Sequence, residues 1–178
     1  MKIAVIEPIG VDTKLLETLA AKLSPEVTLV CFESRTGDTE ELIRRGKDAD
    51  IIVLANQPLP AEAVAGWENV RMLAVAFTGV DHIPLAECRK RDICVCNCAG
   101  YSTAAVSDLV FGMLISFYRR LSACDSAVRA GKTKDGLIGF ELAGKKFGVI
   151  GTGAIGTRVL SIAQAFGCET YAYSRTKK

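Results

Sequence analysis

Several features that commit a sequence to one class of protein are scarce in this chain of 178 residues. It has a single histidine and a single tryptophan, aromatic residues make up only 7%, and the formal net charge is just +2. A pI near 8.1 without a block of basic residues gives no reason to expect a nucleic-acid partner. Hydrophobic residues at 49% and charged residues at 24% instead indicate a folded globular protein and exclude a disordered or collagen-like chain.

Long apolar runs are also missing. The longest largely apolar stretch, residues 104–118, is interrupted by Asp108 and is shorter than the ~20 residues that a membrane span needs. Too few apolar residues precede Glu7 for the start of the chain to be a signal peptide. We therefore expect a cytoplasmic protein without a membrane partner, whose seven cysteines stay reduced.

The cysteines lack the spacing of a typical metal site, since no Cys-x-x-Cys pair is present. Cys94, Cys96 and Cys98 alternate along a predicted strand, which places all three on one face. We expect them to pack as small structural residues, and we expect no bound metal.

The first hundred residues alternate between apolar strands and helices. The predicted strands are residues 2–7, 27–32, 51–54, 71–77 and 93–96, and the predicted helices are residues 11–23, 39–47 and 60–67. Near-continuous apolar strands separated by helices indicate a parallel sheet that is covered on both faces. The layout predicts a flavodoxin-like α/β domain over residues 1–101.

The remaining region, residues 102–178, begins with a long helix that Ser102 or Thr103 caps and that runs to about Arg119. This helix is apolar around most of its circumference, which predicts burial on two sides, between domains or against a second subunit. We therefore expect a homodimer that forms through the 102–119 helix. A shorter helix follows until Gly131, a good C-terminal cap, and residues 132–140 form a loop.

The strongest chemical signal is a G-x-G-x-x-G motif. A strand at residues 147–150 leads into it, a helix at 158–166 follows, and a second strand at 169–173 completes a β-α-β unit. In such a motif the first glycine permits a tight turn, the second lets backbone approach a pyrophosphate, and the third lets helix pack on strand. The N-terminus of the helix then offers N–H groups and a positive dipole end to the anion. The pattern predicts the start of a Rossmann domain, rather than a merely structural turn, with these cofactor-binding residues: Gly151, Thr152, Gly153, Ala154, Ile155 and Gly156.

The end of the second strand selects the nucleotide. An NAD site wants Asp or Glu there, to accept a hydrogen bond from the ribose 2′-OH. This chain has Ser174, Arg175 and Thr176 instead, and Glu169 lies at the wrong end of the strand. A hydroxyl beside a guanidinium suits the 2′-phosphate of NADP. We predict NADP as the cofactor, with NAD possible; a solvated basic C-terminus is the alternative interpretation.

Three stretches together resemble the D-isomer-specific 2-hydroxyacid dehydrogenases, which include glyoxylate/hydroxypyruvate reductases and phosphoglycerate dehydrogenase. They are residues 77–83, 95–108 and 141–146, the last leading into the glycine motif. The resemblance covers essentially the whole chain, but only the amino-terminal part of the family's longer chain. It implies a substrate domain built from both chain ends, an inserted Rossmann domain, and hydride transfer between a nicotinamide cofactor and a small 2-keto or 2-hydroxy acid.

The resemblance also implies roles for single residues. Backbone N–H groups of Thr78 and Gly79 hold the substrate carboxylate, as a loop after a strand is able to do, unless this loop is an ordinary turn. Thr103 lies near the nicotinamide side of the cofactor, unless it is only a helix cap. The family's catalytic Arg, Glu and His all follow Lys178, so we expect no catalytic residue here, and we expect His82 to be structural.

The leading interpretation is the front portion of an NAD(P)-dependent 2-hydroxyacid dehydrogenase that reduces a small 2-keto acid. As a truncated chain without a proton donor, it is expected to be inactive by itself. The alternative is a non-catalytic remnant that acts as a dimerising or cofactor-binding module. The sequence does not identify the keto acid.

Overall fold

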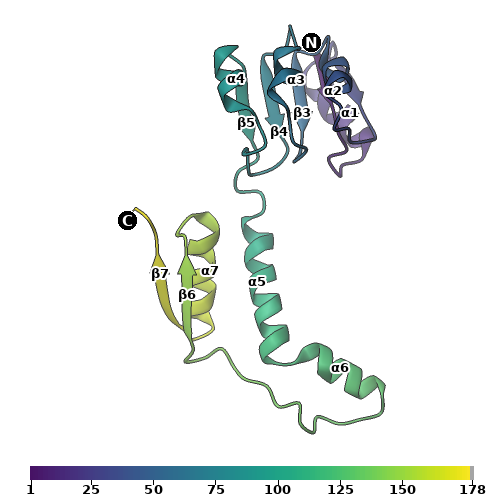
Figure 1. Cartoon of the computed structure of the whole chain (residues 1–178). Helices are drawn as coiled ribbons and strands as arrows, with labels where there is room; N and C mark the ends of the chain where they lie inside the picture. Colours follow the sequence, from purple (N-terminus) through teal and green to yellow (C-terminus); the bar gives the residue numbers. More distant parts are fainter. Residues whose placement is uncertain (177–178) are drawn as a thin grey trace. The chain divides into compact units, whose positions relative to one another are not determined.

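The computed structural model describes residues 1–176. It divides into two compact units, Met1–Ala99 and the residues from Gly100 onward, which are described one at a time (Figure 1). Among residues 1–176, no helix combines the length and the apolar character that crossing a membrane requires.

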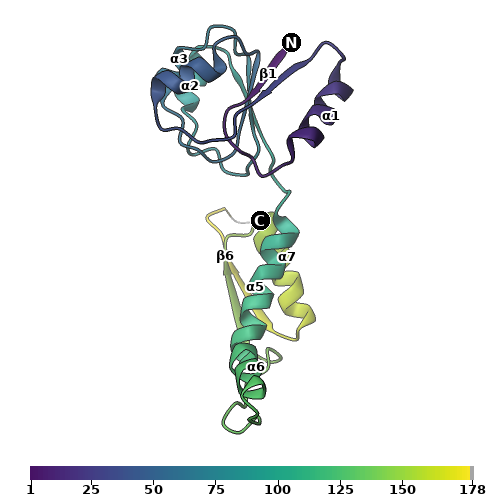
Figure 2. The ribbon, with the colours of Figure 1, turned by 90° about the vertical axis from the view of Figure 1, so that its right-hand side faces the viewer.

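The first unit is a five-stranded parallel sheet of order β2-β1-β3-β4-β5. Its strands are β1 (Lys2–Val5), β2 (Thr28–Cys31), β3 (Ile51–Leu54), β4 (Met72–Val75) and β5 (Cys94–Asn97). Its helices are α1 (Thr13–Leu23), α2 (Thr39–Gly46), α3 (Ala61–Ala65) and α4 (Leu85–Lys90). Figure 2 shows α2 and α3 on one side of the sheet and α1 on the other. The strand order confirms the flavodoxin-like prediction.

Local sequence explains where the helices of this unit begin. The carboxylate of Asp12 accepts the N–H of Lys14 at 2.8 Å, and that of Asp38 accepts the N–H of Glu40 at 3.0 Å, so each caps a first turn. The sequence pattern does not predict α4. This helix has six residues and only one buried side chain, Cys88, which is too short a span to show a helical period.

The core of the first unit lies between the sheet and the helices α2, α3 and α4. Trp67 is fully buried there, and its Nε1 donates to the carbonyl of Leu42 at 3.0 Å. A Cβ at Gly46, the last residue of α2, would overlap the ring of Trp67. The indole therefore packs directly on the helix backbone, which only glycine permits at this point.

Within residues 1–176 the opposite face of the sheet is less covered, and it corrects the packing prediction for the cysteines. Cys94 and Cys96 point to this face and are exposed, as is Cys98 just beyond the strand. The physical reason lies in the topology. The connections that run from β2 to β5 all place their helices on the core face, and α1, the one helix on this face, contacts β2 at the far edge.

The second unit contains two helices followed by a β-α-β unit. Its elements are α5 (Thr103–Tyr118), α6 (Leu121–Arg129), β6 (Lys146–Ile150), α7 (Ala154–Ala165) and β7 (Glu169–Tyr173). The two strands pair in parallel along their whole length. Phe111 of α5 forms the centre of a small core, stacking on Phe147 and Phe166 with ring centroids 5.8 and 5.3 Å apart.

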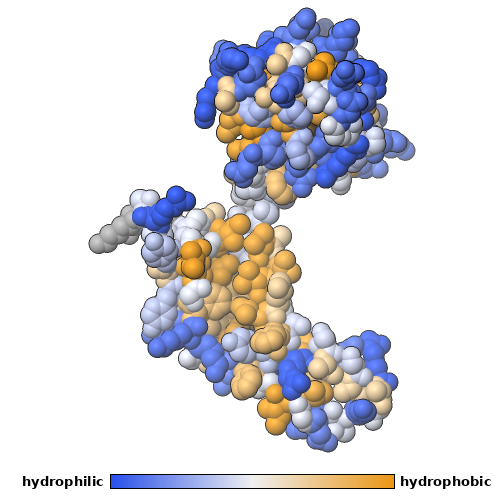
Figure 3. Space-filling model, in the orientation of Figure 1, coloured by the Kyte–Doolittle hydropathy of each residue, from blue (hydrophilic) through white to orange (hydrophobic). Residues whose placement is uncertain are grey.

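Within this unit α5 is buried on one side only. Phe111 faces α7, whereas Leu109, Met113 and Phe117 are 61%, 64% and 79% exposed. Figure 3 shows hydrophobic side chains gathered over this helix. The predicted burial on two sides is therefore not met by this chain's own described residues.

The predicted cap of α5 is wrong in its chemistry. Ser102 occupies the N-cap position, but its side chain makes no capping hydrogen bond. Thr103 is the first helical residue, and its carbonyl accepts from Ser107 Oγ at 2.7 Å. The backbone of Ser102, with ψ near 0°, departs from the extended conformation from which a capping hydroxyl reaches the first turn.

Candidate functional site

The glycine motif forms the turn between β6 and α7. Gly151 has a φ of +99°, which L side chains rarely adopt, and its N–H donates to the carbonyl of Tyr173 at 2.7 Å. A Cβ at Gly156 would overlap the carbonyl oxygen of Gly151. The fold itself thus requires both glycines. Gly153 has open space where a Cβ would stand, so packing does not require a glycine there, and the space leaves room for a ligand to approach the backbone.

The N-terminus of α7 is also suited to bind an anionic ligand. The helix begins at Ala154, four residues before the predicted start at Arg158. The prediction started too late because glycine is a poor helix former, whereas Gly156 lies within the first turn of the helix. Thr157 donates the first intrahelical hydrogen bond, to Gly153 O at 3.0 Å. The N–H groups of residues 154–156 lack an intrahelical acceptor and, with the helix dipole, favour an anion.

The six predicted cofactor residues of the glycine motif therefore lie together, in the turn after β6 and the first turn of α7. Gly151, Gly153 and Ala154 are exposed, and the other three are half-buried. A solvent-open turn with amide donors at a helix N-terminus is chemically suited to hold a pyrophosphate.

The residues that follow β7 lie at the same end of the strand pair as this turn, since Gly151 bonds to Tyr173. Ser174 Oγ donates to the carbonyl of Thr176 at 2.9 Å, while the side chains of Arg175 and Thr176 are exposed. Glu169 begins β7, at the opposite end. The segment where a Rossmann unit contacts the ribose thus offers hydroxyls and a guanidinium.

Thr78 and Gly79 lie at the carboxyl edge of the first unit's sheet, just after β4. Thr78 is exposed and Gly79 is half-buried, and Asn97 Nδ2, at the end of β5, donates to Thr78 O at 2.7 Å. Open parallel sheets bind their ligands at this edge. The hydrogen bond from Asn97 fixes the peptide that the prediction assigns to the substrate carboxylate.

His82 lies in the same loop and joins it to a neighbouring one. Its carbonyl accepts the N–H of Leu59 at 3.1 Å. Its Nε2 is buried and has no hydrogen-bond partner within residues 1–176. The contacts of His82 are therefore those of a residue that connects two loops through its backbone.

Thr103 belongs to the second unit. It is half-buried, and its carbonyl accepts a hydrogen bond from Ser107 Oγ within α5. Its assignment to the nicotinamide side stays a prediction.

Sequence reasoning missed a buried carboxylate at the carboxyl edge of the same sheet. Glu7, two residues after the end of β1, is fully buried, and its Oε1 accepts hydrogen bonds from the N–H groups of Ala55 and Gln57 at 2.8 and 2.9 Å. Its Oε2 lies 2.8 Å from Arg35 Nε. The carboxylate braces the ends of β1 and β3, where the strand order reverses and where ligands bind in such sheets. A charged residue that continues an apolar strand was the available signal.

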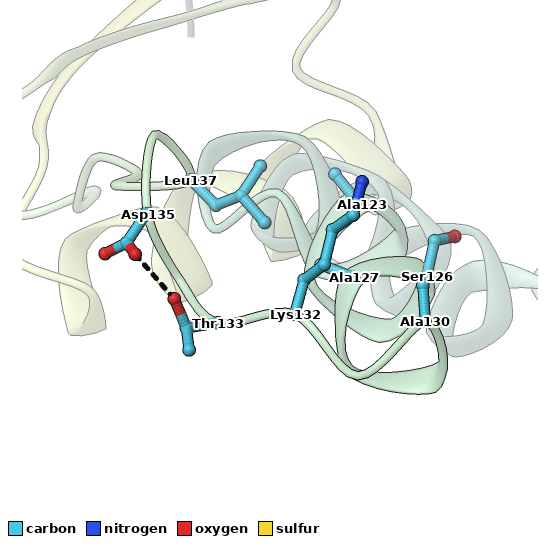
Figure 4. A pocket seen from close by; sticks show the side chains of 8 residues that line it. All are labelled: Ala123, Ser126, Ala127, Ala130, Lys132, Thr133, Asp135 and Leu137. Atoms are coloured by element: carbon cyan, nitrogen blue, oxygen red, sulfur yellow. Dashed lines mark hydrogen bonds between the residues drawn. The ribbon is translucent and has the colours of Figure 1, made fainter.

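A hollow of about 660 Å³ lies elsewhere in the second unit, between α6 and the loop after it (Figure 4). Three of its eight lining residues are alanines, and Thr133 Oγ1 donates to Asp135 Oδ2 at 2.7 Å. It shares no residue with the sites predicted above. Within the described residues, no cluster of three or more His, Cys, Asp or Glu side chains is arranged to hold a metal ion.

Comparison with known families decides the membership of the chain. The family described as D-isomer specific 2-hydroxyacid dehydrogenase, catalytic domain, matches residues 3–176. The chain belongs to this family. It is 37% identical over 120 residues to the glyoxylate/hydroxypyruvate reductase A HPR2 of Arabidopsis thaliana. The aligned region covers 66% of this chain and 38% of that protein.

Two solved structures of similar fold illustrate the likeness. One is an acyclic imino acid reductase in complex with NADPH and D-Arg, with a TM-score of 0.87 and 25% identity over 100% of this chain and 57% of that one. The other is the NAD+-bound 3-phosphoglycerate dehydrogenase of Entamoeba histolytica, with a TM-score of 0.77 and 27% identity over 100% of this chain and 55% of that one. This chain thus spans between about two fifths and three fifths of the proteins it matches.

Membership confirms the resemblance inferred from the three sequence stretches. The family consists of oxidoreductases that use nicotinamide dinucleotides and act on small 2-hydroxy or 2-keto acids. The two solved relatives hold different dinucleotides, so the likeness to them does not choose between NADP and NAD.

Proposed function

We propose that this chain supplies the substrate unit and the first β-α-β unit of the cofactor site of an NADP-preferring dehydrogenase that reduces a small 2-keto acid. The observation that carries the proposal is the glycine turn, where the fold requires Gly151 and Gly156 but leaves open space at Gly153. The activity belongs to a chain that also holds the family's Arg, Glu and His. The 178 residues alone bind the cofactor without turning over a keto acid.

In this proposal the substrate carboxylate accepts hydrogen bonds from the backbone N–H groups of Thr78 and Gly79. Asn97 holds the Thr78 peptide in place, and the Glu7 carboxylate holds the neighbouring loop after β3. The amides of residues 154–156 take the pyrophosphate, and Thr103 lies toward the nicotinamide. The bound dinucleotide supplies the hydride that reduces the keto carbon.

The NADP preference rests on the guanidinium that follows β7. Arg175→Ala is expected to weaken NADPH binding roughly 10- to 100-fold, because a hydrogen bond to a charged group contributes ~1.5–3 kcal/mol. NADH binding should stay unchanged, because NADH lacks the 2′-phosphate. Titration of the chain with each dinucleotide, followed by cofactor fluorescence, measures both affinities.

Arg129→Ala is the matched control for this prediction. Arg129 is also an exposed arginine of the second unit, but it pairs with Asp125 on α6. The Arg129→Ala variant should bind NADPH and NADH with the affinities of the unmodified chain. Equal binding of NADH and NADPH by the unmodified chain would show that the segment after β7 is only a solvated basic tail.

We further propose that α5 forms a homodimer interface. Leu109, Met113 and Phe117 recur every four residues and form one exposed apolar stripe, which monomers seldom leave uncovered. The same stripe is the observation that favours the second candidate function, a non-catalytic dimerising module. A dimer that binds neither dinucleotide would support that second candidate.

Sedimentation equilibrium tests the interface. The unmodified chain should sediment as a dimer, and the double variant Leu109→Glu/Phe117→Glu as a monomer, because two charges would enter an apolar contact. Val128→Glu, on the exposed part of α6, is the control and should remain dimeric. A monomeric unmodified chain excludes the α5 interface.

We place the protein in the cytoplasm. All seven cysteines are free thiols, which suits a reducing compartment. The proposed partners are the dinucleotide, the keto acid and a second copy of the chain.

A further inference from the structure

Cys94 and Cys96 lie side by side on the edge strand β5. Their Sγ atoms are 3.7 Å apart, and both side chains are exposed. They share one face because side chains two apart on a strand point the same way. Within the described residues β5 pairs with β4 alone. The sheet thus holds two thiols next to each other without any rearrangement of the backbone.

The surroundings of the two thiols are apolar. In the register of the sheet, Met72 lies opposite Cys94 and Ala74 lies opposite Cys96, so their side chains share the same face. Both neighbours are half-buried.

The Cys94 thiol is not activated by its surroundings. Cys96, which shares a hydrogen bond with Cys94, raises the pKa of the Cys94 thiol, and Asp92 raises it further. Cys94 is therefore protonated at neutral pH and lacks the activation of a single reactive thiolate.

The geometry favours a bridging atom over a disulfide. A disulfide needs sulfurs about 2.0 Å apart and Cα atoms within about 6.8 Å of each other. Residues two apart on an extended strand have Cα atoms roughly 6.6 Å apart, at the long end of this range. The sulfurs, 3.7 Å apart, would have to move together by more than an ångström, so closing that bond would distort β5. A single atom bonded to both sulfurs does not require the sulfurs to be bonded to each other, and this arrangement is compatible with their separation of 3.7 Å.

We propose that Cys94 and Cys96 form a dithiol site for a soft, thiophilic ligand of the trivalent arsenical class. An organoarsenic oxide reacts there with both thiols. Two As–S bonds form, the bonds between arsenic and oxygen break, and the two thiol protons leave with the oxygen as one water. No atom changes oxidation state. An apolar group on the arsenic lies against the face that carries Met72 and Ala74.

Phenylarsine oxide is the probe, added to the 178-residue chain that a phosphine has kept reduced. Intact-mass spectrometry should show one phenylarsenic group per chain, which a small dithiol removes and a monothiol does not. Cys94→Ser and Cys96→Ser should each weaken binding at least ~100-fold, the usual gain from linking two binding groups. Both positions are exposed, so neither variant opens a cavity, and thermal melting by circular dichroism checks that each folds.

Cys98→Ser and Cys124→Ser are the matched controls, because each removes one thiol outside the pair. They should bind the probe as the unmodified chain does. Failure of the unmodified chain to form an adduct overturns the proposal. So does an adduct that survives in Cys94→Ser or Cys96→Ser, or one that disappears in Cys98→Ser.

Discussion

Replacing Gly156 by alanine is expected to weaken dinucleotide binding by the second unit strongly. The added methyl group would overlap the carbonyl oxygen of Gly151, so α7 must move away from the turn after β6. The amides of residues 154–156 would move with it, and we expect at least a ~10-fold loss of affinity, equivalent to about 1.4 kcal/mol. Overpacking at this contact should also destabilise the unit by ~1–3 kcal/mol. Cofactor titration and thermal melting measure the two effects.

Two other glycines separate binding from folding. Gly148→Ala, within β6, meets open space and should change neither quantity. Gly153→Ala also meets open space, so melting should be unchanged, but binding should fall because the methyl group would stand between the backbone and the pyrophosphate. If the Gly153→Ala and Gly156→Ala variants both bound the dinucleotide as tightly as the unmodified chain, the proposal that this turn binds the cofactor would be wrong.

Replacing Glu7 by alanine is expected to destabilise the first unit by roughly 2–4 kcal/mol. The change leaves the N–H groups of Ala55 and Gln57 without their acceptor, and a buried unpaired donor costs about 1–3 kcal/mol. The loop after β3 loses the contacts that fix it beside the proposed substrate site. Urea denaturation followed by Trp67 fluorescence reports the change in the free energy of unfolding.

Arg35→Ala is the control that separates the two interactions of Glu7. The arginine side chain is 56% exposed, but its partner Glu7 is fully buried, so Arg35→Ala leaves Oε2 without its counter-ion. The two backbone hydrogen bonds to Oε1 remain in this variant, so the loss should be smaller than that of Glu7→Ala. A loss as large as that of Glu7→Ala would mean that the ion pair, rather than the two backbone hydrogen bonds, stabilises this edge of the sheet.

The sequence by itself determined the features that rest on local patterns. The strand at residues 51–54 was predicted to the residue, because a run of four apolar residues is visible in the chain itself. The strand at residues 169–173 was also predicted to the residue, from its place after the glycine motif and the helix in a β-α-β unit. The alternation of strand and helix was enough to predict the flavodoxin-like sheet. The spacing of three glycines was enough to locate the turn between β6 and α7, which we propose as the cofactor site.

Only the tertiary structure decided which side chains meet. The partners of Glu7 lie 48 and 50 residues away in the chain, and no local pattern announces such a contact. The exposure of Cys94 and Cys96 depends on which face of the sheet the helices cover, so a strand pattern alone gave the wrong packing. The start of α7 depends on Gly156 fitting against Gly151. In each case the deciding energy comes from contacts between segments distant in sequence, which exist only once the chain has folded.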